Sequence, residues 1–167
     1  DVNISNDLYT EADFTFNGTA SISRTDAGTT AMGLAEDQFV NTNDNFTDVI
    51  FVVEDGAVTI TPIDVTVTVT GANNTTAYDG VERTVTGYTA VADNNLYNVA
   101  SDFTFTPATN ATLVNGVIAA KRTDVGTTNM GLAPEQFANT NTNFDQVTFT
   151  VVDGYQTITP ISATVNI

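Results

Sequence analysis

The sequence predicts an all-β protein built from tandem immunoglobulin-like sandwich repeats, and three observations support this prediction. The 167 residues include 32 Thr, 20 Val and 18 Asn, an excess of strand-forming and turn-forming residues. One segment of the chain occurs twice. Strand-length segments bounded by Gly, Asn and Asp recur about seven times in a period of roughly 100 residues. A β-grasp sheet that packs against a short helix is the alternative arrangement.

The repeat covers most of the chain. Residues 24–63 align without a gap to residues 122–161, and about two thirds of the aligned positions are identical. Upstream, residues 13–16 match residues 102–105 with a smaller shift, which places an insertion at residues 106–114. A surface loop accepts such an insertion at little entropic cost.

This repeat gives the domain boundaries. We expect an N-terminal β repeat at residues 1–63, truncated at its start, and a complete repeat at residues 64–167 that includes the first strand of the next copy. In that copy, residues 162–167 (SATVNI) stand where residues 64–69 (DVTVTV) stand in the previous one. Residues 64–88 could instead complete the first repeat. Without them the first repeat would have an exposed sheet edge, which favours pairing with another chain.

The strands of one period follow from alternation and turn residues. Val and Thr alternate over residues 65–70, as in a half-buried strand, and residues 71–76 (GANNTT) are typical of a loop. Tyr78-Asp79-Gly80 predicts a tight turn, in which Gly supplies a positive φ. The remaining strands are expected, in order, at residues 81–88, 102–105, 117–123, 127–132, 144–152 and 155–161.

Two further local motifs complete the period. An early Pro followed by Glu is favoured in a first helical turn, so we expect a short helix at residues 132–137 (LAPEQF) and its counterpart at residues 34–39 (LAEDQF). Asp-Gly at residues 153–154 predicts a two-residue hairpin between the two closing strands, and Asp-Gly at residues 55–56 predicts the same turn in the first copy.

A comparison of the two copies indicates which residues are buried. In the closing strand Val49, Phe51 and Val53 recur unchanged, whereas the residues between them differ. Positions that keep their identity while their neighbours vary are those that face a packed core. The core is therefore expected to contain Met32, Leu34, Phe39, Phe46 and Ile60 in the first copy, and Met130, Leu132, Phe137, Phe144, Val147, Phe149, Val151 and Ile158 in the second.

Charge and composition exclude several classes of function. The net charge is -16, from 20 acidic and 4 basic residues, and the chain has no Cys or His. Disulfides, thiolate metal sites and His-dependent nucleophiles are therefore excluded. Nucleic acid and anionic membranes are not expected as partners, because phosphate contacts require many Lys and Arg. No apolar segment is long enough to insert into a membrane, and this composition is common among extracellular bacterial proteins.

Carboxylates are the remaining catalytic candidates, since a pair of them can hydrolyse a glycoside. The repeated aspartates are Asp13, Asp26 and Asp55, with Asp102, Asp124 and Asp153 as their counterparts. Asp55 and Asp153 belong to the expected hairpin turns, and Asp26 and Asp124 precede Gly in expected Asx turns. We interpret all of them as structural and assign no catalytic residue.

Calcium is the other candidate ligand. Residues 41–48 (NTNDNFTD) and the neighbouring Glu36-Asp37 supply oxygen atoms. In the second copy Asp44 and Asp48 are replaced by Thr142 and Gln146. We therefore interpret the segment as an Asn-rich turn and assign no metal and no cofactor.

Lys121 is the single lysine, and its counterpart in the first copy is Ser23. A Lys–Asn crosslink of the kind found in some adhesins cannot therefore be a feature of the repeat. We expect Lys121 to be solvated.

An ordered set of short motifs runs along the chain. It consists of Tyr78-Asp79-Gly80, Thr86-Gly87-Tyr88, Thr-Asp-x-Gly-Thr at residues 25–29 and 123–127, Asn-Phe at residues 45–46 and 143–144, and Asp-Gly-x-x-Thr-Ile-Thr-Pro at residues 55–62 and 153–160. Together these motifs resemble the YDG/MBG-type repeats of large bacterial surface proteins and adhesins, over nearly the whole chain. The resemblance implies tandem arrays that act as stalk or adhesive repeats without enzymatic activity, and it implies structural roles for the motif residues.

These observations lead to an expected function. We expect a structural spacer or stalk module of a bacterial cell-surface adhesin-like protein, with neighbouring repeats of the same chain as partners. The alternative is an adhesive module that binds a host glycan or protein through an exposed strand face or the insertion at residues 106–114.

Overall fold

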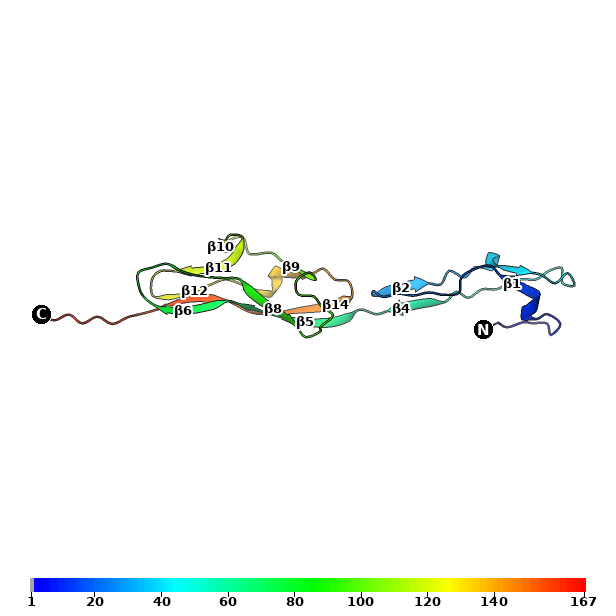
Figure 1. Cartoon of the computed structure of the whole chain (residues 1–167), viewed down its shortest axis with the longest axis horizontal. Coiled ribbons are helices and arrows are strands. Elements are labelled where there is room, and N and C mark those ends of the chain that lie inside the picture. The colour runs from blue at the N-terminus through cyan, green and yellow to red at the C-terminus, as the bar shows by residue number, and fades with distance from the viewer. Residues whose placement is uncertain (1) are drawn as a thin grey trace. The chain divides into compact units, whose positions relative to one another are not determined.

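The computed structural model describes residues 2–167, which form short strands and three single 3-10 turns (Figure 1). No α-helix occurs in this described range, and the all-β prediction is confirmed. The chain divides into two compact units: unit 1 ends at Pro62, and unit 2 comprises Ile63–Ile167. Among the described residues, every strand pairing joins strands of the same unit.

The first sheet of unit 2 is centred on β5 (Ile63–Gly71), the strand with alternating Val and Thr. β5 runs parallel to β14 (Phe144–Val152) and antiparallel to β8 (Tyr88–Ala92). In the parallel pair Val65, Val67 and Val69 lie opposite Val147, Phe149 and Val151. The first strand of the unit therefore pairs directly with one of its last.

The second sheet of unit 2 also contains a parallel pair. Its two parallel strands directly follow β5 and β14 in the chain. β15 (Tyr155–Thr159) lies between β6 (Asn73–Ala77), which is parallel to it, and β12 (Gly126–Asn129), which is antiparallel. The expected loop at residues 71–76 is thus wrong. Its polar residues form a strand because β15 supplies a partner for their backbone groups.

Two further pairings complete unit 2. β11 (Val117–Arg122) pairs antiparallel with β7 (Arg83–Thr86) and with β10 (Leu113–Val114), while β9 (Phe103–Phe105) pairs with β13 (Phe137–Asn139). β10 ends the insertion that was expected to be a loop. Its turn to β11 is Asn115-Gly116, with φ values of 51° and 81°, as in the Asn-Gly hairpin that favours positive φ at both residues.

Three chain segments pass from one sheet to another, and hydrogen bonds join them where they pass. The β5–β6 segment crosses at Ala72, the β7–β8 segment at Gly87 and the β14–β15 segment at Gly154. Ala72 N–H donates to Gly87 O at 3.0 Å, and Tyr155 N–H donates to Ala72 O at 3.2 Å. Backbone pairing therefore continues through the crossing.

The hairpin expected at residues 153–154 does not form, because the chain crosses between sheets at this point. β14 and β15 do not pair with each other; β14 continues along β5, and β15 continues along β6. Because the β5–β6 segment and the β14–β15 segment change sheets at the same place, each keeps a parallel partner. The break at Gly87, with a φ of 83°, likewise divides the strand that was expected at residues 81–88.

The expected short helices are each a single 3-10 turn, η2 (Glu36–Gln38) and η3 (Pro134–Gln136). Phe follows each turn at once and begins a strand, β3 (Phe39–Asn41) in unit 1 and β13 in unit 2. The helical start signal is therefore correct locally, but strand pairing stops the turn from growing.

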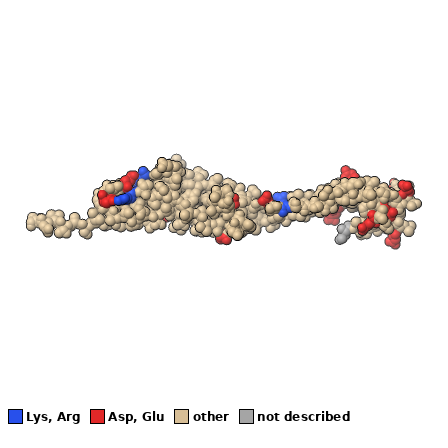
Figure 2. Space-filling view, in the orientation of Figure 1, with Lys and Arg blue, Asp and Glu red and all other residues tan. Residues whose placement is uncertain are grey.

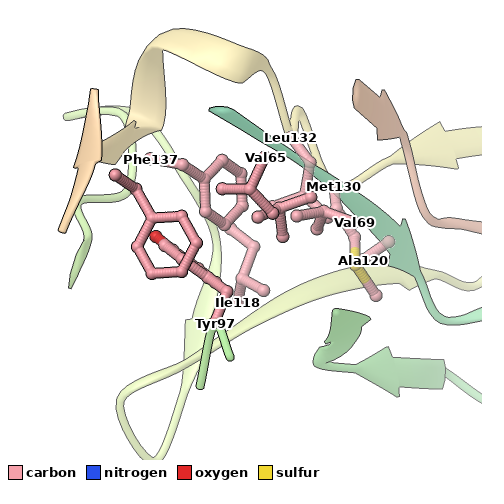
Figure 3. Close-up of a cluster of buried hydrophobic side chains, with 10 residues drawn as sticks. Val65, Val69, Tyr97, Ile118, Ala120, Met130, Leu132 and Phe137 are labelled. Atoms are coloured by element: carbon pink, nitrogen blue, oxygen red, sulfur yellow. The ribbon is translucent and has the colours of Figure 1, made fainter. Parts of the chain in front are cut away.

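The core of unit 2 lies between β5, β11 and the β9–β13 pair. Its buried side chains cluster together (Figure 3) and are Val65, Val67, Val69, Tyr97, Ile118, Ala120, Met130, Leu132, Phe137 and Phe144. Val147, Phe149 and Val151 pack against this cluster and are partly buried, whereas Val152 is exposed. The face assignment derived from the two copies is confirmed.

Unit 1 has fewer strands. After a 3-10 turn η1 (Glu11–Asp13), β1 (Phe14–Phe16) pairs with β3, and β2 (Gly28–Ala31) pairs with β4 (Ala57–Ile60). Tyr9 is its one buried hydrophobic residue among those described. The segment Val49–Glu54, which corresponds to β14, is not assigned to a strand. Among residues 2–167 no strand pairs with this segment in the way that β5 pairs with β14.

Candidate functional site

The repeated aspartates hold loops together. In unit 1 the carboxylate of Asp13 accepts hydrogen bonds from Thr10 N–H at 2.7 Å and from Asn43 Nδ2 at 2.9 Å. The Thr10 backbone bond is the main reason that the pKa of Asp13 lies below its usual value. In unit 2 the Asn141 side chain and the Asn98 backbone do the same for Asp102 and lower its pKa.

The aspartates of the two Asp-Gly pairs bridge the chain to a distant loop. Asp55 accepts hydrogen bonds from Leu34 N–H at 2.9 Å and Gly33 N–H at 3.0 Å, and these two donors lower its pKa. Asp153 accepts the equivalent pair from Leu132 and Gly131. The hairpin turns expected at the two Asp-Gly pairs do not form, and each carboxylate instead holds the backbone of a loop that is distant in sequence.

The Thr-Asp-x-Gly-Thr loops are organised by the Arg that precedes them. Arg122 donates to Val125 O at 2.8 Å and to Thr128 Oγ1 at 3.2 Å, and Arg24 makes the corresponding bonds in unit 1. A Cβ atom at Gly126 would lie 2.7 Å from Cζ of Arg122. The glycine therefore makes room for the guanidinium group. The Asx turns at Asp26 and Asp124 stay a prediction.

The Asn-rich segment, the candidate calcium site, is a turn in which the first Asn side chain bonds to the backbone of the residues that follow it. In unit 2 Asn139 Nδ2 donates to Asn141 O and Phe144 O, and Asn139 Oδ1 accepts from Asn141 N–H and from Tyr97 Oη. Asn41 makes the same bonds in unit 1. Across residues 2–167 no three acidic side chains gather where they could hold a metal ion.

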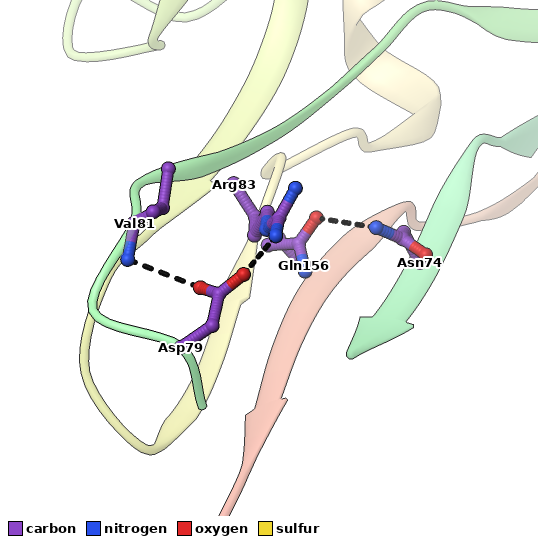
Figure 4. Close-up of polar contacts among 5 residues, drawn as sticks. All are labelled: Asn74, Asp79, Val81, Arg83 and Gln156. Atoms are coloured by element: carbon purple, nitrogen blue, oxygen red, sulfur yellow. Dashed lines mark hydrogen bonds and ion pairs between the residues drawn. The ribbon is translucent and has the colours of Figure 1, made fainter. Parts of the chain in front are cut away.

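Charged pairs account for two of the basic side chains. Lys121 Nζ lies 3.4 Å from Glu82 Oε1, and Arg83 is paired with Asp79 (Figure 4). The Asp79 carboxylate also accepts a hydrogen bond from Val81 N–H at 3.0 Å, which is the first cause of its lowered pKa. On the visible face, the few basic side chains lie beside acidic ones (Figure 2).

A polar contact between a buried and a half-buried side chain joins two strands of unit 2. Gln156 is fully buried, and its Oε1 accepts a hydrogen bond from Asn74 Nδ2 at 3.1 Å (Figure 4). The pair joins β15 to β6 in the parallel sheet, so it fixes the register of the two strands. The sequence comparison gave no signal for it, because the first copy has Val58 at the position of Gln156 and lacks the Asn74 segment.

A groove of about 490 Å³ in unit 1 is a surface feature that the sequence comparison missed. Its apolar lining includes Ile4, Phe14, Phe46, Val49, Phe51 and Val53. Phe51 packs on Phe39 and Phe14, with ring centroids 5.6 and 5.5 Å apart. The signal that could have indicated this groove is the smaller number of residues that the first copy contributes to the alignment, since the aromatic side chains that line the groove have counterparts in the core of unit 2.

Comparison with known proteins returns no matching family model, no matching curated protein and no matching solved structure. None of the helical turns in residues 2–167 has the length and apolarity needed to cross a bilayer.

Proposed function

We propose that this chain is a structural spacer of a bacterial cell-surface, adhesin-like protein, made of tandem immunoglobulin-like β-sandwich modules. The pairing of the first and last strands of unit 2 is the observation that supports this most strongly. β5 pairs in parallel with β14, and β6 pairs in parallel with β15. Tension enters the unit at Ile63 and leaves it after Thr159. It therefore pulls two adjacent parallel segments in opposite directions along their length.

Under such tension the hydrogen bonds between the two segments are loaded together in shear. A hairpin pulled at its open end would instead lose its bonds one after another. Seven residue pairs join β5 to β14, and a further five residue pairs join β6 to β15. A module of this construction suits a position where a chain carries load between a surface and a distal domain.

The hydrogen bonds of the repeated aspartates support a structural role for these residues over a catalytic one. Asp13, Asp55, Asp102 and Asp153 each accept backbone or amide hydrogen bonds within their own unit. The same bonds occur in both copies. Selection for a repeated framework explains this duplication, whereas a catalytic site has no need of it. The net charge of -16 favours solubility of such a module.

Single-molecule force spectroscopy on the whole chain, held at its two ends, tests the proposal. Val151→Ala removes packing within the parallel pair of β5 and β14. Val85→Ala in β7 is the control, because both valines are partly buried against the same core. We expect V151A to lower the unfolding force of unit 2 and V85A to lower it much less at a similar loss of thermal stability. An equal loss of unfolding force in the two variants would contradict this mechanical role.

The adhesive alternative has one observation in its favour. The insertion ends in the β10–β11 hairpin, where Leu113 and Val117 are each 45% exposed. An array of glycans and host matrix proteins, probed with the whole chain and with L113S/V117S, separates the two functions. Specific binding that the double variant abolishes would favour the adhesive module.

A further inference from the structure

We propose that unit 2 binds unit 2 of a second copy of this chain through the free edge of β8, in an antiparallel pairing that joins two three-stranded sheets into one continuous sheet. This inference goes beyond the spacer role and does not depend on it, since it identifies a partner and a binding mode from strands inside unit 2.

β8 is the outermost strand of the first sheet of unit 2. The strand order is β14-β5-β8, so one edge of β8 pairs with β5, and within residues 2–167 no strand lies beside the other edge (Figure 1). On the outward face of the strand Thr89 is exposed, and Val91 is 67% exposed. Tyr88, Ala90 and Ala92 face the other way and pack against the core. The strand therefore presents an open edge next to an exposed apolar side chain.

The backbone groups at the open edge follow from two hydrogen bonds that flank the β5–β8 pairing. Ala72 N–H donates to Gly87 O, and Asp93 N–H donates to Thr66 O, each at 3.0 Å. Hydrogen-bonded positions alternate along an antiparallel pair. Residues 89 and 91 therefore bond to β5, and residues 88, 90 and 92 turn their N–H and C=O groups to the open edge. In the described part of the chain these groups have no hydrogen-bond partner, and such an edge accepts another strand.

Other outermost strands of unit 2 have features that oppose such pairing. β14 contains a bulge between Phe144 and Val147, and the charged Asp145 lies within it. β7 begins with the charged Arg83, and β6 exposes Asn73, a residue type that is unfavourable in strands. Charges and bulges are means by which proteins protect sheet edges. β8 has no charge, no Pro and no bulge.

A second β8 is complementary to this edge when the two Ala90 residues lie opposite each other. Tyr88 then pairs with Ala92 of the second copy, and every N–H and C=O group at the open edge has a partner. On the outward face Thr89 lies opposite Val91 of the second copy, and both side chains are β-branched, as strand pairing favours. A shift by one residue would place open groups opposite groups that already bond to β5. A shift by two would leave one open residue on each strand without a partner.

Charge does not oppose this pairing, although the net charge of the chain is -16. The charged residue nearest to β8 is Asp93, which would lie opposite Gly87 of the second copy. The two Asp93 residues would then be separated along the strands by about 20 Å, whereas the Debye length at physiological salt is about 8 Å. The edge is thus self-complementary in hydrogen bonds and in charge, which identifies a second copy of this chain as its occupant.

Sedimentation velocity on the whole chain at physiological salt, over a series of rising concentrations, tests the association. We expect the wild type to form a dimer reversibly. Val91→Asp places like charges close together on the outward face of the paired strands and should weaken dimerisation at least about tenfold. Val152→Asp is the matched control and should leave dimerisation unchanged, because Val152 is 55% exposed on the same face of the sheet but lies in β14, at the opposite edge.

Thermal melting of the two variants accompanies the measurement and should change little and equally, since both side chains are exposed. A wild type that stays monomeric at every concentration, or two variants that dimerise alike, would overturn the proposal.

Crosslinking tests the register, because the chain has no native cysteine. A chain with Thr89→Cys is mixed with a chain with Val91→Cys, and a disulfide between the two is expected under mild oxidation, since these positions lie directly opposite each other as a non-hydrogen-bonded pair. Each variant alone should crosslink much more slowly, because the same position in the two copies is offset by two residues. Val152→Cys replaces Val91→Cys in the control and should not crosslink. Faster crosslinking in either variant alone than in the mixture would overturn the assigned pairing.

Discussion

Gly71 and Gly154 approach so closely that a Cβ atom on Gly71 would lie 2.6 Å from the Cα atom of Gly154. Here the two parallel segments of unit 2 leave one sheet and enter the other. No side chain fits between them, and the backbone itself fills the space. Met130 N–H donates to Gly154 O at 2.8 Å, so the crossing is also bonded to a third segment.

Gly71→Ala should destabilise unit 2 by about 3 kcal/mol or more, because its Cβ would meet backbone atoms that cannot rotate away. Gly80→Ala is the control: its φ is 75°, but no atom lies within 4 Å of the added Cβ. It should cost about 1 to 2 kcal/mol from backbone strain alone. Chemical denaturation measures both values, and equal costs would mean that the crossing can relax.

Phe149→Ala should cost about 3 to 4 kcal/mol, because the ring packs against Phe103 and Phe137, with centroids 5.4 and 5.5 Å away, and lies opposite Val67. Phe51→Ala should cost only about 1 to 2 kcal/mol, since the same ring position in unit 1 borders an open groove. Denaturant unfolding of the two variants checks the difference. Val52→Thr, on the exposed face, should stay under about 1 kcal/mol, and a larger effect would show that the faces are reversed.

The lowered pKa values of Asp13, Asp55 and Asp102 predict loss of stability in acid. A carboxyl whose pKa is lower when folded contributes stability above its unfolded pKa, near 3.8, and that stability is lost as the pH falls toward the folded pKa. Thermal melts should therefore show a falling Tm below about pH 4. Asp55→Asn should reduce the slope of Tm against pH in unit 1, and an unchanged slope would argue against its carboxylate as a source.

Asn139→Ala should destabilise unit 2 by about 2 to 3 kcal/mol, because the amide bonds to two carbonyls and accepts from Tyr97 Oη. Thr142→Ala in the same turn is exposed and should cost less than about 0.5 kcal/mol. Thermal unfolding compares the pair. Calcium should not rescue N139A, since the amide acts through the turn, and chelator-sensitive rescue would instead reveal a metal site.

The sequence predicted the strands best where both faces had a clear pattern. β5 and β14 lie where alternation and the comparison of copies expected them, because inward positions such as Val67 and Phe149 are held by packing. Asp55 and Asp153 accept equivalent backbone hydrogen bonds in the two units, although the hairpin turns expected at these residues do not form. The positions of β5 and β14 were predictable because a local pattern and an internal comparison contain the relevant information.

The sequence could not predict the groove of unit 1. It indicated that the first copy lacks strands, but the depth and lining of the space depend on how Phe14, Phe39 and Phe51 pack without them. The buried Gln156 was missed for a similar reason. Its partner Asn74 lies 82 residues away, and no local pattern links the two.

By itself the sequence determined the all-β class, the inward face of the closing strand and the positions of the helical turns η2 and η3, because each depends on residues that are near in the chain or are compared between copies. Only the tertiary structure decided the partners of the strands. Asp153-Gly154 is locally compatible with a hairpin, and residues 73–77 are locally compatible with a loop. The parallel pairing of β6 with β15 excludes both, since backbone hydrogen bonds between distant segments outweigh the small local preference.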